Sequence, residues 1–163
     1  MLVDKVKRIA EKLTYKVSLE LDIGTTFQTA KLKWLGFTYL TQSDLEEINK
    51  VAESLGFKVT EYYLRNGFKA CLDDVRAFED LCKQFMNIFK DTILTLDKVE
   101  IRNSDIKFRC IMPKTFVVPK NLIESLTTIF DRLKNEGFTV GRIDFIEMDG
   151  QLGEIILELV ADF

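Results

Sequence analysis

Acidic residues surround the last predicted turn of the chain and are the clearest candidates for metal chemistry. Asp144, Glu147, Asp149 and Glu154 flank a turn at Asp149-Gly150, and Mg²⁺ prefers carboxylate oxygens as ligands. A solvated hairpin end gives the same pattern, because acidic residues are usually exposed and turns favour Asp and Gly. We therefore expect no bound metal or cofactor, and a Mg-dependent enzyme that uses this acidic hairpin is an alternative.

Histidine is absent from the 163 residues, which excludes Ser-His-Asp and Cys-His catalysis and His-ligated metal sites. The three cysteines, Cys71, Cys82 and Cys110, are spaced unlike any paired zinc-binding motif. The apolar pattern places Cys82 on the buried stripe of a helix and Cys110 on the inward face of a strand, which predicts buried, reduced thiols. An enzyme is not favoured, because no polar catalytic constellation is visible.

Aromatic and basic residues occur together on several predicted strands, as in sheets that stack RNA bases. Tyr62 and Tyr63 are adjacent and must point to opposite faces of a strand, so at least one is expected to leave the core. The chain has 23 basic and 26 acidic residues, without the basic excess that phosphate backbones demand. Single-stranded RNA or DNA binding is therefore an alternative rather than the favoured function. Its candidate binding residues are Lys31, Lys33, Trp34, Phe37, Tyr39, Tyr62, Tyr63 and Arg65.

Apolar residues also fall at strand positions that simple alternation does not place on one face. They are Tyr62, Leu64, Ile111, Ile143, Phe145, Ile156 and Val160. A sheet with apolar groups on both faces needs a partner, which would be a second copy, another protein or a small apolar ligand. The sequence therefore predicts a non-enzymatic binding or assembly protein that acts through an apolar and aromatic sheet face, by self-association or protein binding. A small-molecule-binding module is a further alternative.

The elements that position these side chains repeat one order four times, a helix followed by two strands. The 3.6-residue apolar period and the caps predict helices at 2–14, between Ser43 and Gly56, at about 74–90, and from Pro119 to Glu136. Alternation predicts strands at 15–22, 27–40, 57–64, 68–73, 92–101, 105–112, 138–148 and 152–162.

Local signals mark several ends of these elements. Ser43 and Glu46 have the spacing of a capping box, and Gly56 is expected to end the same helix in a left-handed conformation. Asn66-Gly67 predicts a hairpin turn. A shift of the inward-facing set near Gly36 predicts a bulge in the strand at 27–40.

This order predicts the α+β class, with duplicated αββ units forming antiparallel sheet or sheets and helices packed on one face. Two framings stay open, a ferredoxin-like βαββαβ arrangement and duplicated βαββ modules. The motif Gly-Phe-x-Val recurs at 56–59 and 137–140, which supports an internal duplication of halves 1–73 and 74–163. The length fits one compact domain.

The composition, 47% hydrophobic and 30% charged residues with two prolines, predicts a packed globule and excludes a disordered chain. The N-terminal residues carry charges early, and no apolar run is long enough to cross a bilayer. We therefore expect a cytoplasmic protein without membrane contact. Abundant Lys and Glu beside few Asn and Gln are typical of heat-adapted proteins.

Overall fold

The computed structural model describes residues 1–24, 29–36, 40–63, 69–72, 78–103 and 105–160, of which 61, 63, 69–72 and 160 are described by their backbone. Within these residues the chain is an α+β protein, as the sequence predicts. The elements are α1 (Leu2–Lys12), β1 (Val17–Asp22), β2 (Thr29–Trp34), α2 (Gln42–Ser54), β3 (Val59–Tyr63), β4 (Lys69–Leu72), α3 (Glu79–Phe89), β5 (Thr95–Ile101), β6 (Asp105–Thr115), α4 (Lys120–Asn135), β7 (Thr139–Met148) and β8 (Gln151–Val160).

The described strands form one sheet in the order β3-β4-β2-β1-β5-β6-β8-β7, and every neighbouring pair is antiparallel. Counted outward from the centre, one arm runs β1, β2, β4, β3 and the other runs β5, β6, β8, β7. The strands of a βαββαβ unit read from β2 are not contiguous, because β1 lies between β2 and β5.

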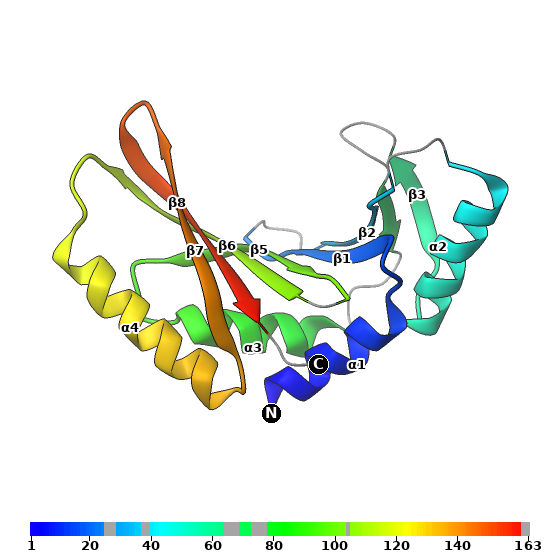
Figure 1. Ribbon diagram of the computed structural model, residues 1–163, viewed down its shortest axis with the longest axis horizontal. Coiled ribbons are helices and arrows are strands. Elements are labelled where there is room, and N and C mark those ends of the chain that lie inside the picture. Colours follow the sequence, from blue (N-terminus) through cyan, green and yellow to red (C-terminus); the bar gives the residue numbers. More distant parts are fainter. Residues whose placement is uncertain (25–28, 37–39, 64–68, 73–77, 104, 161–163) are drawn as a thin grey trace.

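The helices lie on one side of this sheet (Figure 1). α1 and α3 run beneath the central strands and contact β5, whereas α2 packs on β2 and α4 packs on β7. The two arms rise on either side of β1 and β5, so the other side of the sheet is concave (Figure 1). We call this side the open face, because no described helix covers it.

The hydrophobic core fills the space between the sheet and the helices. Because successive strand residues point to opposite faces, every second residue of the central strands enters this core. Leu19 on β1 is paired with Leu32 on β2, and both side chains are buried. Phe108 on β6 meets Phe85 and Phe89 of α3 edge-on, with ring centroids 5.4 and 5.8 Å apart. One core therefore continues through both arms.

The start of α2 differs from the prediction. Its N-cap is Thr41, whose hydroxyl accepts from the Asp44 amide at 3.2 Å, while the Asp44 carboxylate accepts from the Thr41 amide at 2.9 Å. The predicted Ser43 and Glu46 box is wrong, because the same spacing occurs two residues earlier and Ser43 already lies inside the first turn. The left-handed glycine after α2 is confirmed, with φ 84° at Gly56.

The predicted long strand at 27–40 is also corrected, since β2 ends at Trp34 and has no described bulge. The backbone at Gly36 lies against the Trp34 indole, where an added Cβ would be 2.5 Å from the indole nitrogen. The chain therefore passes close to the indole directly after β2.

Two hairpins close the ends of the sheet. β3 and β4 pair as predicted, although the predicted Asn66-Gly67 turn lies outside the described residues. β7 and β8 are joined through Asp149 and Gly150, with φ of 56° and 77°. Positive φ at both central residues is the geometry of a type I′ turn, which matches the twist of the flanking strands.

Candidate functional site

Charged side chains, rather than apolar ones, occupy the middle of the open face. They alternate with the core residues, since Glu20 and Asp22 on β1 lie between the buried Leu19, Leu21 and Ile23. The expectation of an apolar second sheet face is therefore wrong for the described central strands. The described charged residues of this face are Glu20, Asp22, Lys31, Lys33, Lys98, Glu100, Asp105, Lys107, Arg109, Arg142, Asp144, Glu154 and Glu158.

The apolar residues expected on this face divide between the two sides of the sheet. Ile111 and Ile156 do lie among the open-face positions, paired with Glu154 and Arg109. Ile143 and Phe145 instead pair with the buried Leu157 and Ile155 and so share the helix side. A register shift between Val140 and Arg142 moves them there, because a bulge inverts the alternation that follows it. Leu64 and the Val160 side chain lie outside the described residues.

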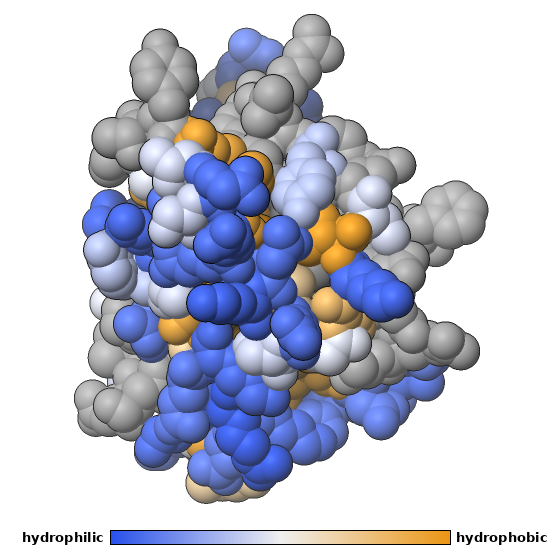
Figure 2. Space-filling model, turned by 90° about the vertical axis from the view of Figure 1, so that its right-hand side faces the viewer, coloured by the Kyte–Doolittle hydropathy of each residue, from blue (hydrophilic) through white to orange (hydrophobic). Residues whose placement is uncertain are grey.

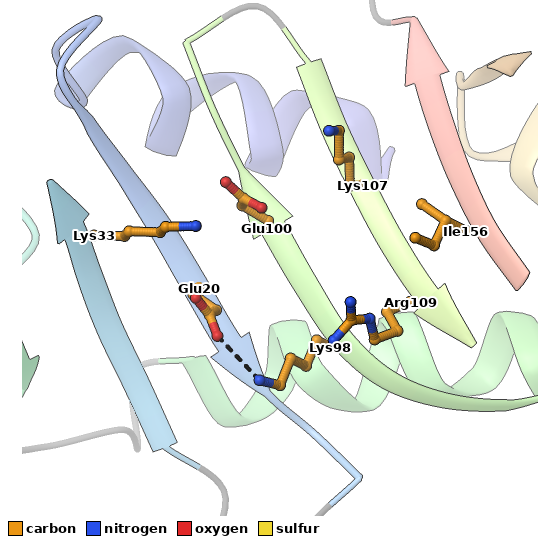
Figure 3. A pocket seen from close by; sticks show the side chains of 7 residues that line it. All are labelled: Glu20, Lys33, Lys98, Glu100, Lys107, Arg109 and Ile156. Carbon is orange, nitrogen blue, oxygen red and sulfur yellow. Dashed lines mark hydrogen bonds and ion pairs between the residues drawn. The ribbon is translucent and has the colours of Figure 1, made fainter. Parts of the chain in front are cut away.

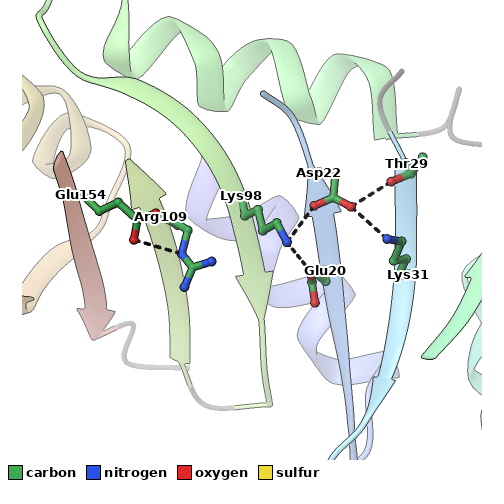
Figure 4. A network of polar contacts seen from close by, with 7 residues as sticks. All are labelled: Glu20, Asp22, Thr29, Lys31, Lys98, Arg109 and Glu154. Carbon is green, nitrogen blue, oxygen red and sulfur yellow. Dashed lines mark hydrogen bonds and ion pairs between the residues drawn. The ribbon is translucent and has the colours of Figure 1, made fainter. Parts of the chain in front are cut away.

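An ion-pair network ties β1 to both neighbouring strands (Figure 4). Lys98 Nζ on β5 lies 3.3 Å from Glu20 Oε1 and 3.5 Å from Asp22 Oδ1. Asp22 Oδ2 also lies 3.3 Å from Lys31 Nζ and accepts from the Thr29 hydroxyl at 3.0 Å. Burial acts to lower the pKa of Lys98, but Asp22 and Glu20 outweigh it and the pKa rises above its ordinary value. Lys98 is therefore charged at neutral pH.

A cavity of about 290 Å³ opens beside this network, above the central strands (Figure 3). It is lined by residues of five strands, namely Glu20, Lys33, Lys98, Glu100, Lys107, Arg109 and Ile156. Four of these side chains are cationic and two are anionic. We call this space the central cavity.

Most charges of the central cavity have partners outside it. Glu100 lies 2.9 Å from Arg102. Lys107 lies 3.6 Å from Glu158 and Arg109 lies 4.0 Å from Glu154, and both of these carboxylates are on β8. Lys33 has no ion-pair partner among the described residues.

The two halves of the chain contribute matching positions to the central cavity. Glu20 and Glu100 are direct cross-strand partners where β1 meets β5. Each carboxylate is also opposite a lysine on the next strand outward, Lys31 for Glu20 and Lys107 for Glu100. Two residues further along these strands are the basic residues Lys33 and Arg109. The pattern Lys-Leu-Lys of β2 therefore corresponds to Lys-Phe-Arg of β6.

The structure separates the residues predicted to bind nucleic acid. Lys31 and Lys33 lie on the open face. Trp34 is a correction, since it lies on the helix side with 6% of its surface exposed and offers no ring for stacking. Tyr62 also faces the helices, where its hydroxyl donates to Asn49 of α2 at 2.9 Å. Phe37, Tyr39, Arg65 and the Tyr63 side chain lie outside the described residues.

The predicted acidic hairpin does not converge into a metal site. Asp144 pairs with Arg142 at 3.0 Å, and Glu154 lies beside Arg109. Within the described part of the chain, no group of three or more carboxylates or thiols is arranged to hold a metal ion.

The predicted burial of two cysteines is confirmed. Cys82 and Cys110 are both buried free thiols. Burial raises the pKa of Cys82 to about 11, and burial followed by the charge of Asp97 raises that of Cys110. Both thiols are therefore protonated at neutral pH and poor nucleophiles. The side chain of Cys71 lies outside the described residues.

A second surface lies where the β6–α4 loop, the start of α4 and the β7–β8 hairpin meet. Four of its side chains line an apolar recess of about 350 Å³. The Phe116 ring lies over the hairpin, 3.8 Å from where a Cβ on Gly150 would stand. The surface comprises large apolar side chains that are 50–75% exposed, and we call it the end patch: Phe116, Val117, Val118, Ile123, Phe145 and Met148.

Comparison of the chain with protein-family models, with curated proteins and with solved structures returns no match. Among the described residues, none of the helices has the length and apolar character that crossing a membrane requires.

Proposed function

We propose that this chain is a non-enzymatic binding and assembly protein, and that it self-associates through the end patch. The observation that carries this proposal is the gathering of six exposed apolar side chains around one recess. Monomeric proteins rarely expose contiguous apolar patches larger than a few hundred Å². The patch is suited to be the apolar centre of an interface, which buries about 800 Å² on each partner.

A second copy of the chain fits this surface because the patch carries both a projection and a recess. Val117 is 75% exposed and stands beside the recess that Phe116, Val118, Ile123 and Phe145 help to line. In a two-fold dimer each copy contributes the same patch to the interface, so a projection of one copy meets the recess of the other.

The charged residues around the end patch form a basic side and an acidic side, so two copies of the patch can meet with opposite charges in contact. The exposed Lys114 and Lys120 lie on the side of β6 and α4, whereas the exposed Glu147 and Asp149 lie on the β7–β8 hairpin. A two-fold arrangement brings the basic side of one copy against the acidic side of the other, which favours this pairing over a parallel one.

Sedimentation equilibrium over a range of chain concentrations tests the proposal. We expect a monomer–dimer equilibrium, and Val117→Asp should raise the dissociation constant about 30-fold or more, the effect of losing a central contact worth about 2 kcal/mol. Tyr15→Asp is the matched control, since Tyr15 is also 75% exposed but lies between α1 and β1. A strict monomer at high concentration, or equal weakening by both variants, contradicts the proposal.

We also propose that the halves 1–73 and 74–163 arose by duplication. Three correspondences support this inference: the two arms have the same strand order, Glu20 and Glu100 occupy equivalent central positions, and Gly56 and Gly137 end α2 and α4 with φ of 84° and 90°. A permuted chain that begins with α3 and ends with β4 tests it, because equivalent halves tolerate a cut between them. Failure of the permuted chain to fold would count against the duplication.

A further inference from the structure

We infer that the central cavity is a binding site for a small anion that carries two or more carboxylate or phosphate groups. The inference concerns the open face and does not depend on self-association through the end patch. Its basis is the excess of hydrogen-bond donors over acceptors among the side chains that line the cavity.

The donors come from opposite arms of the sheet. Lys33 rises from β2 with its amine directed over the central strands, and the Arg109 guanidinium extends toward them from β6 (Figure 3). Lys33 has no ion-pair partner in the described part of the chain. Arg109 has one loose contact, through Nε at 4.0 Å from Glu154, which leaves the terminal nitrogens of the guanidinium for a ligand. A guanidinium fork binds carboxylate or phosphate oxygens through two parallel hydrogen bonds.

The carboxylates of the cavity already have cations. Glu20 is held by Lys98 at 3.3 Å and Glu100 by Arg102 at 2.9 Å. Because these acceptors are engaged, a cationic ligand would have to displace a lysine or an arginine. An anionic ligand needs no such exchange. It meets Lys33, which has no ion-pair partner among the described residues, and the terminal nitrogens of Arg109, and it adds a partner for Lys107, whose own ion pair is 3.6 Å long.

The dimensions of the site limit the ligand. The cavity of about 290 Å³ has room for about ten water molecules at roughly 30 Å³ each. Three steps between neighbouring strands separate β2 from β6, a distance of about 14 Å at roughly 4.8 Å per step. A ligand that engages Lys33 and Arg109 together therefore needs anionic groups at two points. Ile156 on β8 adds an apolar wall at the end of the cavity beyond Arg109.

No described aromatic side chain lies on the open face around this cavity. Single-stranded nucleic acids are bound mainly by base stacking on aromatic rings together with phosphate contacts. The observations therefore favour a small anion over a nucleic acid strand, and the experiment below distinguishes the two.

Isothermal calorimetry with pyrophosphate, with citrate and with acetate at constant ionic strength tests the inference. We expect pyrophosphate or citrate to bind and acetate to bind far more weakly, because acetate has a single anionic group. Lys33→Gln and Arg109→Gln should each weaken binding about 10- to 100-fold, as expected for losing one hydrogen bond to a charged group. The preference between pyrophosphate and citrate shows whether the site takes phosphate or carboxylate.

Arg142→Gln is the matched control, because Arg142 also lies on the open face but pairs with Asp144 outside the cavity. We expect it to leave binding unchanged, and the same holds for Val117→Asp, which separates this site from the end patch. Absence of binding with both pyrophosphate and citrate at about 10 mM, enough to saturate a millimolar site, would overturn the inference. Equal weakening by Arg142→Gln, or tight binding of single-stranded RNA that Lys33→Gln abolishes, would also overturn it.

Discussion

The two arms of the sheet have the same strand order but present different outer surfaces. The end that carries α2 is mostly hydrophilic where described residues reach the surface, with a few separate hydrophobic spots (Figure 2). Its exposed aromatics among the described residues are Tyr15 and Tyr62, which are not adjacent, and Tyr62 donates a hydrogen bond to Asn49. The end that carries α4 instead exposes the end patch. The two arms therefore share the buried positions that define the sheet, whereas their exposed positions differ.

The centre of the open face shows the opposite relation, since there the two arms agree. Glu20 with Lys31 on one side corresponds to Glu100 with Lys107 on the other. Like charges directly across strands are unfavourable, so the pair Glu20 and Glu100 requires the cations around it. The contrast separates two kinds of surface: a polar centre in which the two arms match, where we propose that a small anion binds, and an apolar end patch on one arm, where we propose that a second copy binds.

The largest expected effects are those of substitutions in the core, where equivalent positions of the two arms can be compared. Phe108 and Leu32 hold equivalent buried positions on β6 and β2. We expect Phe108→Ala to lower the free energy of unfolding by about 3–5 kcal/mol and Leu32→Ala by about 2–5 kcal/mol. Phe108→Ala should lower the free energy of unfolding more than Leu32→Ala, because the Phe108 ring also contacts Phe85 and Phe89.

Urea unfolding followed by Trp34 fluorescence and by circular dichroism measures this effect and asks whether the arms unfold together. Trp34 is the only tryptophan and lies in the arm opposite Phe108. Because one sheet and one core join the arms, Phe108→Ala should shift both signals equally. A fluorescence transition that keeps its midpoint while the dichroism transition moves would mean that the arms are independent units. Met86→Ala, at a half-exposed position of α3, should cost less than about 1 kcal/mol.

The polar centre of the open face can be tested by comparing two lysines whose carboxylate partners differ in burial. Lys98 forms ion pairs with Glu20 and Asp22, which are each 7% exposed, whereas Lys107 forms an ion pair with the more exposed Glu158. We expect Lys98→Met to cost about 1–2 kcal/mol, a value reduced for the partial exposure of the lysine. Lys107→Met should cost less than about 1 kcal/mol.

The pH dependence of that difference follows from the raised pKa of Lys98. A lysine whose folded-state pKa lies above its ordinary value of 10.5 stabilises the fold fully below that value. The contribution is lost as the pH rises through the folded-state pKa. Unfolding curves of the native chain and Lys98→Met should therefore differ at pH 7 and converge only as the pH rises above 10.5 through the folded-state pKa. A constant gap across this range would mean that the charge of Lys98 is not what stabilises β1.

Much of this architecture can be predicted from the sequence, because it depends on local patterns. The order of helices and strands, the burial of Cys82 and Cys110, and the left-handed Gly56 all follow from apolar periodicity and turn chemistry. Simple alternation does not give the face of Ile143 and Phe145, because a register shift between Val140 and Arg142 inverts the alternation that follows it. Gly141, the residue between these two positions, is the local signal that could have indicated the bulge, because glycine inside a strand often marks one.

The central cavity was not predicted, although its residues leave a visible pattern. Charges occupy every second position of four predicted strands, in pairs such as Lys31 and Lys33 or Lys107 and Arg109. Alternation shows that each pair shares a face, but only the strand order shows that the pairs meet over β1 and β5. The end patch was missed for a related reason, because the run Phe116-Val117-Val118 does not reveal whether another element covers it.

The smallest expected effects concern the first residues of α2 and α4, where the two arms differ in helix capping. α2 begins with the reciprocal bonds of Thr41 and Asp44, whereas α4 begins at Pro119 without a side-chain cap. We expect Thr41→Ala to cost about 1 kcal/mol and Pro119→Ala less than about 0.5 kcal/mol, both measured by urea unfolding. The double variant of Thr41 and Asp44 should cost less than the sum of its two single variants, because each residue satisfies the amide of the other. Additive costs would mean that the two bonds are independent and that α2 does not begin with a coupled box.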